Sequence, residues 1–207
     1  MKVFFLYSII AFCVLLTIHF DYHVYTAVIV ACAYILTMFI NRNNPNIVHL
    51  CCFLLLFKAI EQFVFLFVPF TAGEGELPVW TNNTIYMIHV SFDVALLFTL
   101  WYRGFLSRYI YSKLDKPIKG LHLTFADIGL FLVVVLFVIV DLYAAIENLV
   151  RNMEHLGIPE DVAKEYWKVN WMFYNYSDIK RWLMGAEFLA IWTMISAMAK
   201  REFKLKV

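Results

Sequence analysis

Residues 47–68 read IVHLCCFLLLFKAIEQFVFLFV, a run apolar enough to cross a bilayer that nevertheless carries Lys58, Glu61 and Gln62 near its middle. At about 1.5 Å of rise per residue, a helix of this length covers roughly 33 Å, close to the hydrocarbon thickness of a membrane. The three polar side chains would therefore lie within the bilayer. Ionisable groups placed there are costly and need partners, so other segments must supply them.

The whole chain has the composition of a membrane protein. Of its 207 residues, 63% are hydrophobic and 16% are charged, against about 45–50% and about 25% in soluble domains. The mean hydropathy is +0.72. The four cysteines lie inside apolar segments without metal-type spacing, as small core residues do. We expect one membrane domain, residues 1–207, with no room for a separate soluble catalytic domain and no sign of nucleic-acid binding.

Hydropathy predicts an all-α fold, a polytopic membrane bundle of six transmembrane helices. They are expected at about residues 3–20, 24–40, 47–68, 84–102, 125–149 and 179–199. The first is expected to be a retained helix, because no small-x-small cleavage site follows its apolar core before Asp21. Residues 159–176 are rich in aromatic side chains and are expected to form a segment at the outer membrane surface.

The basic residues of the loops support this topology. They are Lys2, Arg42, five residues of the fourth loop (Arg103, Arg108, Lys113, Lys116 and Lys119) and the tail residues Lys200, Arg201, Lys204 and Lys206. With six helices, all of them fall on one side of the membrane. The positive-inside rule then makes both termini cytoplasmic. The short loops and the expected lack of a cleaved signal favour a bacterial inner membrane.

Four of the expected helices place ionisable residues in one layer of the outer half of the membrane. Measured from the outer helix ends, Glu61 lies about 10 Å deep, His89 about 8 Å, Asp93 about 14 Å, Asp141 about 9–12 Å, Glu187 about 12 Å and Lys58 about 15 Å. Helical spacing puts Gln62 on the face of Lys58 and Glu61. These seven residues form the candidate solute- or ion-binding site. Four carboxyls face one lysine, so protonation, a cationic His89, a bound cation or water must compensate.

Simpler interpretations of the same residues stay open. Lys58 with Glu61 or Asp93 is also explained as a buried ion pair that fixes helix register. Asp141 and Glu187 are shallow enough to face interfacial water.

Two further groupings of polar residues have interpretations of their own. Glu147 and Arg151, four residues apart, suit a surface ion pair. His89, Asp93 and Glu61 have the donor types of a Zn²⁺, Mn²⁺ or Fe²⁺ site. One histidine with scattered carboxylates is a weak metal signature, so no cofactor is indicated.

The leading functional hypothesis is a transport- or channel-related unit that binds a proton, a cation or a small cationic solute at this cluster. The alternative is a non-catalytic interaction protein, an assembly partner or immunity-type protector that contacts a membrane partner or a second copy of itself. Residues 179–199 and the loop 151–177 would make that contact. An intramembrane metal enzyme is the third hypothesis. The chain lacks catalytic motifs such as HExxH or a Walker loop, which leans against an enzyme.

Overall fold

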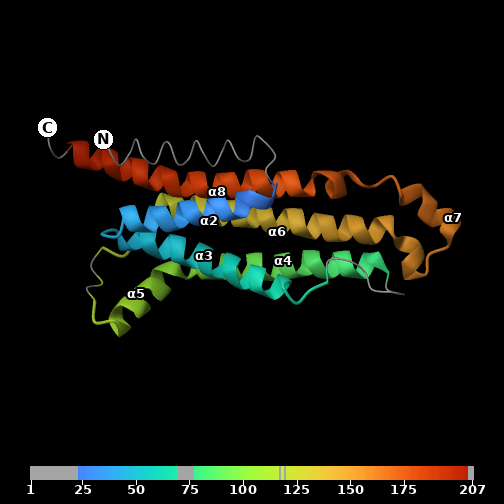
Figure 1. Ribbon diagram of the computed structural model, residues 1–207, viewed down its shortest axis with the longest axis horizontal. Coiled ribbons are helices and arrows are strands. Elements are labelled where there is room, and N and C mark those ends of the chain that lie inside the picture. The colour runs from blue at the N-terminus through green and yellow to red at the C-terminus, as the bar shows by residue number, and fades with distance from the viewer. Residues whose placement is uncertain (1–22, 70–76, 117, 119, 205–207) are drawn as a thin grey trace.

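The computed structural model describes residues 23–69, 77–116, 118 and 120–204. Every regular element of these residues is a helix, and together they form an elongated bundle (Figure 1). The elements are α2 (His23–Ile40), α3 (Pro45–Phe65), α4 (Pro78–Trp101), α5 (Arg103–Lys113), α6 (Phe125–Arg151), the 3-10 turn η1 (Met153–Leu156), α7 (Glu160–Ala163), the 3-10 turn η2 (Lys164–Tyr166) and α8 (Trp171–Lys204). The expected first helix, residues 3–20, lies outside the described residues.

Three of the described helices, α3, α4 and α6, are long and apolar enough to cross a membrane. The apolar stretch of α2, Val28–Ile40, is shorter than these three helices. The described part of the chain therefore indicates an integral membrane protein with an all-helical fold. Six spans and two cytoplasmic termini stay predictions.

The long helices α2, α3, α4, α6 and α8 alternate in direction along the chain (Figure 1). A tight turn, in which the Asn44 N–H donates to the Asn41 carbonyl at 2.7 Å, joins α2 to α3. The side chain of Asn148 near the end of α6 donates to the Val79 carbonyl at the start of α4, at 2.8 Å. On the opposite side of α6, Thr124 just before its start contacts the Met194 sulfur of α8 at 3.1 Å. Helix α6 is thus the central element, between α4 and α8.

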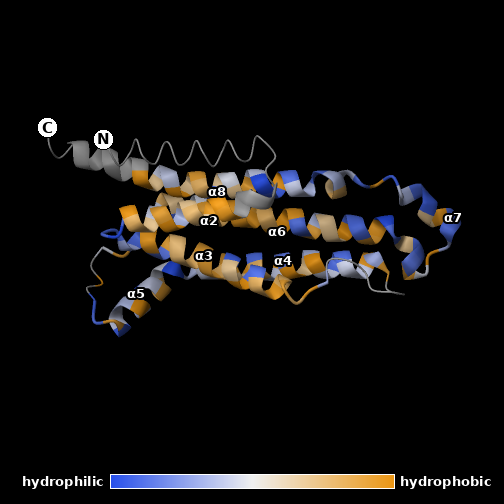
Figure 2. Ribbon diagram, viewed as in Figure 1, coloured by the Kyte–Doolittle hydropathy of each residue, from blue (hydrophilic) through white to orange (hydrophobic). Residues whose placement is uncertain are grey.

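Two apolar cores lie at different levels of the bundle. The larger joins α2, α3, α4, α6 and α8 around Leu50, Leu130 and Ile191. The smaller joins only α4, α6 and α8, around Tyr86, Ala144 and Met172. Beyond the end of α3, the helices α4, α6 and α8 continue toward α7, where hydrophilic residues are frequent (Figures 1 and 2). The candidate site residues lie between the two cores.

Two helices begin earlier than the hydropathy pattern predicts. Helix α4 starts at Pro78 rather than at residue 84, because a proline lacking its N–H is well suited to a first helical turn. Helix α8 starts at Trp171 rather than at residue 179. Residues 159–176 are therefore divided between α7, η2 and the first turns of α8, and their position at the outer membrane surface stays a prediction.

The linker after α4 is also more ordered than expected. Its first part forms α5, which begins directly after Tyr102. Arg103, counted above among the solvent cations of this linker, is completely buried. The basic character of the described linker thus rests on Arg108, Lys113 and Lys116, all of which are exposed.

Candidate functional site

The centre of the candidate site is one lysine shared by two aspartates. Lys180 Nζ of α8 donates to Asp141 Oδ1 and Oδ2 of α6 at 2.8 and 2.9 Å. The same ammonium lies 3.4 Å from Asp93 Oδ2 of α4. The two carboxyls also interact with each other. We call Lys180, Asp141 and Asp93 the triad; it joins α4, α6 and α8.

The two carboxyls of the triad differ in how well they are stabilised. The Asp141 side chain is fully buried, and it accepts a further hydrogen bond from the Tyr176 hydroxyl at 2.7 Å. Asp93 accepts a longer hydrogen bond from Lys180, at 3.4 Å, and its side chain is 15% exposed. Asp141 therefore has more and shorter hydrogen bonds than Asp93.

A second ion pair lies beside the triad. Lys58 Nζ of α3 is 3.1 Å from Glu187 Oε2 of α8, whose side chain is buried. Both ammonium groups lie near the ring of Phe137: Lys180 Nζ is 4.7 Å and Lys58 Nζ 5.7 Å from its centre. Both cations lie within the range of a cation–π interaction, so one aromatic ring connects the pair to the triad.

Glu61 and His89 form a third contact, between α3 and α4. Glu61 Oε1 lies 2.6 Å from His89 Nδ1, a short hydrogen bond. The His89 ring is 4.8 Å from the Phe65 ring and 6.3 Å from the Tyr176 ring, centre to centre. His89 therefore lies between Glu61 and the tyrosine that binds Asp141.

The structure brings together six of the seven residues predicted for the site. Gln62, the seventh, is exposed on α3. The residues that sequence reasoning missed are Lys180 and Tyr176. Both share a face of α8 with Glu187, at spacings of i, i+4 and i+11. With Lys180, the count becomes four carboxyls against two lysines, and His89 supplies a third cation when protonated.

The donor set of the proposed metal site does not converge. Glu61 contacts His89, but Asp93 turns to Lys180 instead. Within residues 23–69, 77–116, 118 and 120–204, no group of three His, Cys, Asp or Glu side chains is placed to hold a metal ion.

A different buried ionic contact lies at the opposite end of the described bundle. Arg103 of α5 pairs with Asp127 of α6, with Nη2 to Oδ2 at 2.7 Å, and the same Nη2 donates to the His122 carbonyl at 2.6 Å. Asp127 also accepts from the Thr124 amide and hydroxyl, at 2.5 and 2.8 Å, in a capping box that begins α6. Asn46 of α3 lies 3.4 Å from Arg103 Nη1. We call this the Arg103 locus.

Glu147 was expected to form a surface pair with Arg151, and this was wrong. Glu147 is buried, and its two oxygens accept hydrogen bonds from the Met172 and Phe173 amides at 2.8 and 2.7 Å. A carboxylate at a helix N-terminus satisfies free amides and the helix dipole. Arg151 instead lies over the Phe173 ring, with Cζ 4.1 Å from its centre.

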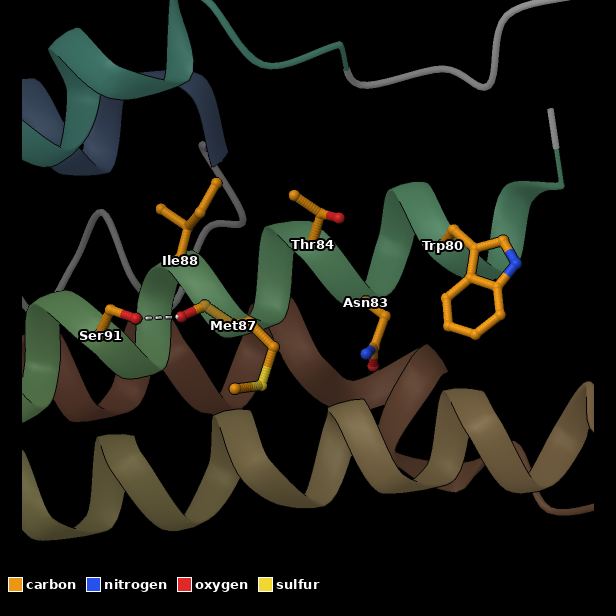
Figure 3. A pocket seen from close by; sticks show the side chains of 6 residues that line it. All are labelled: Trp80, Asn83, Thr84, Met87, Ile88 and Ser91. Atoms are coloured by element: carbon orange, nitrogen blue, oxygen red, sulfur yellow. Dashed lines mark hydrogen bonds between the residues drawn. The ribbon is translucent and has the colours of Figure 1, made fainter. Parts of the chain in front are cut away.

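An open groove of about 270 Å³ runs along α4. Its six lining residues all come from this helix: Trp80, Asn83, Thr84, Met87, Ile88 and Ser91. Figure 3 shows Thr84 and Ile88 on one side of α4, and Asn83 and Met87 on the other. The Ser91 hydroxyl donates to the Met87 carbonyl at 2.7 Å, so its polar group is satisfied within the helix.

The fold and the site define a class: an all-helical integral membrane protein with a cluster of paired ionisable residues between its helices. No protein-family model matches the chain, and neither the curated proteins nor the solved structures include one that matches it. The function must therefore be argued from the site.

Proposed function

We propose that the protein binds and releases a proton at Asp93 within the membrane, as part of a transport- or channel-related unit. The observation that carries this proposal is the sharing of Lys180 by Asp93 and Asp141. One ammonium balances only one of two carboxylates. The excess negative charge favours uptake of a proton or a small cation, since an uncompensated charge in the bilayer is costly.

The pattern of hydrogen bonds favours Asp93 over Asp141 as the group that takes the proton. Asp141 accepts from Lys180 through both oxygens and from Tyr176, which stabilises its charged form. Asp93 has the longer contact to the ammonium. A proton on Asp93 leaves Lys180 paired with Asp141 and allows the two carboxyls to share a hydrogen bond.

The neighbouring groups offer a route for that proton. The His89 ring has two nitrogens that can donate or accept a proton, and its Nδ1 contacts Glu61. The Tyr176 ring lies beside His89, and its hydroxyl binds Asp141. Glu61, His89, Tyr176 and the triad thus form a series of exchangeable protons from α3 to α6.

The depth of the cluster agrees with this role. Helix α3 has 21 residues and a length of about 32 Å, close to the hydrocarbon thickness. Glu61 lies one turn before its end, at Phe65. If α3 crosses the membrane, the cluster lies in its outer half, within reach of water from the end where α4, α6 and α8 continue. Placement in a bacterial inner membrane remains a prediction from composition.

Infrared spectroscopy of the reconstituted protein tests the proton site. In wild type, a protonated carboxyl C=O band should disappear as the pH is raised, and D93N should lack that titration. D115N is the matched control, because Asp115 is an exposed carboxyl outside the bundle. A D93N spectrum that titrates like wild type would refute proton binding at Asp93.

Proton flux into liposomes tests the transport role separately. Wild type should collapse an imposed pH gradient faster than protein-free vesicles, and D93N should slow this by about tenfold or more, a factor equivalent to about 1.4 kcal/mol. D115N should match wild type. If vesicles with wild-type protein were no more permeable to protons than protein-free vesicles, proton transport would be excluded. The infrared test of proton binding at Asp93 would be unaffected.

The groove on α4 favours a second candidate function, that of a membrane interaction protein. Trp80, Thr84, Met87 and Ser91 are exposed along one stripe of a helix apolar enough to span a membrane. Serine and threonine in such a stripe allow another transmembrane helix to approach closely. Purification in mild detergent should then yield a stoichiometric partner or a homo-oligomer that S91F dissociates. A monomer unaffected by S91F would count against it.

A further inference from the structure

Helix α5 differs from the other long helices of the described chain in leaving the bundle. It follows α4 after one residue and runs obliquely away from α3 and α4 (Figure 1). Its attachment is strong, because Arg103 and Ser107, one turn apart, are buried. The first of these belongs to the Arg103 locus. Further along, the Tyr111 ring packs edge-on against the His49 ring of α3, with centres 5.0 Å apart. Helix α5 is therefore held along one face, while the face of Phe105 and Tyr109 lies open.

The open face of α5 carries large apolar side chains. Phe105 is 68% exposed and Tyr109, one turn later, is 53% exposed; their rings are stacked, with centres 6.4 Å apart. Leu114, just after the helix, is 57% exposed. Exposed apolar surface of this kind marks contact with a membrane or a partner.

Basic residues lie beside this apolar surface. Arg108, Lys113 and Lys116 are exposed, and Asp115 is the acidic residue among them. The ammonium groups of Lys113 and Lys116 lie 5.8 Å from the ring centres of Tyr109 and Tyr111, respectively. Arg108 also donates to the Leu121 carbonyl at 3.4 Å. The cations are thus positioned around the aromatic side chains.

We propose that α5 is an interfacial helix that binds the anionic phospholipids of one leaflet. Phe105 and Tyr109 enter the boundary between headgroups and acyl chains, and Lys113 and Lys116 bind lipid phosphates. Charge complementarity favours anionic lipid as the binding partner. An apolar face flanked by lysine and arginine is typical of helices that lie on anionic membrane surfaces. This proposal does not depend on proton binding at Asp93.

Native mass spectrometry of the full chain tests the proposal. The protein is released from micelles containing equal amounts of phosphatidylcholine and phosphatidylglycerol. Wild type should retain phosphatidylglycerol preferentially, and K113Q/K116Q should lose that preference by about fivefold per cation removed. The matched control, K164Q/K168Q, removes two exposed lysines at the α7 end and should keep the wild-type preference.

Hydrogen exchange of residues 103–113 locates the lipid. Their amides should exchange more slowly in nanodiscs with 30% phosphatidylglycerol than in pure phosphatidylcholine, and K113Q/K116Q should abolish the difference. Equal retention of both lipids by wild type would overturn the proposal. So would a wild-type preference in K113Q/K116Q, or lipid-dependent exchange confined to helices other than α5.

Discussion

The Arg103 locus and the triad are both buried ionic contacts between helices, but they differ in charge balance. Arg103 has one carboxylate partner, Asp127, together with hydrogen bonds to the His122 carbonyl and Asn46. Lys180 has two carboxylate partners. The charges of the Arg103 locus balance, whereas the triad has two carboxyls and only one ammonium. A buried charge therefore indicates a functional site only when the opposing charges do not balance.

The two contacts also hold different parts of the chain. The Arg103 locus fastens helix ends: the starts of α3, α5 and α6 meet there. The triad and the Lys58 pair connect α3, α4, α6 and α8 away from the helix ends. Apolar side chains at these positions would cost less free energy to bury than charged ones. Replacing buried ion pairs by apolar groups is often neutral or stabilising, so stability alone does not explain why the triad is charged.

The largest expected effect comes from breaking the Arg103 locus. D127A leaves Arg103 buried without its carboxylate, and loss of one partner of a buried pair costs about 3–5 kcal/mol. Thermal unfolding in mild detergent should show a large fall in melting temperature. D93N should lower it far less, because Lys180 keeps both contacts to Asp141.

The double variant R103M/D127L is the control for this prediction. It removes both charges, so it should recover much of the stability lost in D127A. If D93N proved as destabilising as D127A, the proposed difference in charge balance between the triad and the Arg103 locus would be wrong.

A smaller effect is expected from removing the shared cation. K180M leaves Asp93 and Asp141 facing each other without an ammonium, and an unsatisfied buried group costs about 1–3 kcal/mol. K180R retains a cation and should lie nearer to wild type. The same unfolding measurement distinguishes them. Equal melting temperatures for K180M and wild type would mean that Lys180 does not hold the three helices together.

The smallest effect is expected at Glu154, a carboxylate that is more accessible than those of the triad and the Arg103 locus. Hydrogen bonds from its own backbone N–H and from Trp167 Nε1, at 3.1 Å, lower the pKa of Glu154. A carboxyl whose pKa is lower in the folded state stabilises the fold when the pH is above its unfolded-state pKa. This stabilisation is lost as the pH falls through the folded-state pKa. The Trp167 indole N–H resonance should therefore shift below about pH 4.5, and E154Q should remove that shift. A resonance that titrates equally in E154Q would contradict the contact.

The sequence predicted much of the site because depth and helical face are simple functions of residue number. Glu61, His89, Asp93 and Glu187 were placed in one layer from the rise per residue, and each contacts a charged partner in the cluster. Lys180 was missed because it stands next to the expected start of its helix, residue 179, where a lysine is unremarkable. The true start at Trp171 makes it the tenth residue of α8.

Contacts between distant segments explain the other differences. Arg103 follows Trp101 and Tyr102 like an ordinary interfacial cation, and nothing near it in the sequence shows that Asp127 lies within reach. Glu147 and Arg151 have the spacing of a surface pair, but Glu147 binds amides 25 and 26 residues away. Local patterns gave the apolar helices; only tertiary packing decides which charge meets which.

The cap that Glu147 places on α8 has a consequence for the order of events during synthesis. The amides of Met172 and Phe173 emerge long after Glu147, so this carboxylate waits without its donors until the chain turns back along α6. The contact between the end of α6 and the start of α8 can therefore form only after Phe173 has been synthesised and has left the ribosome.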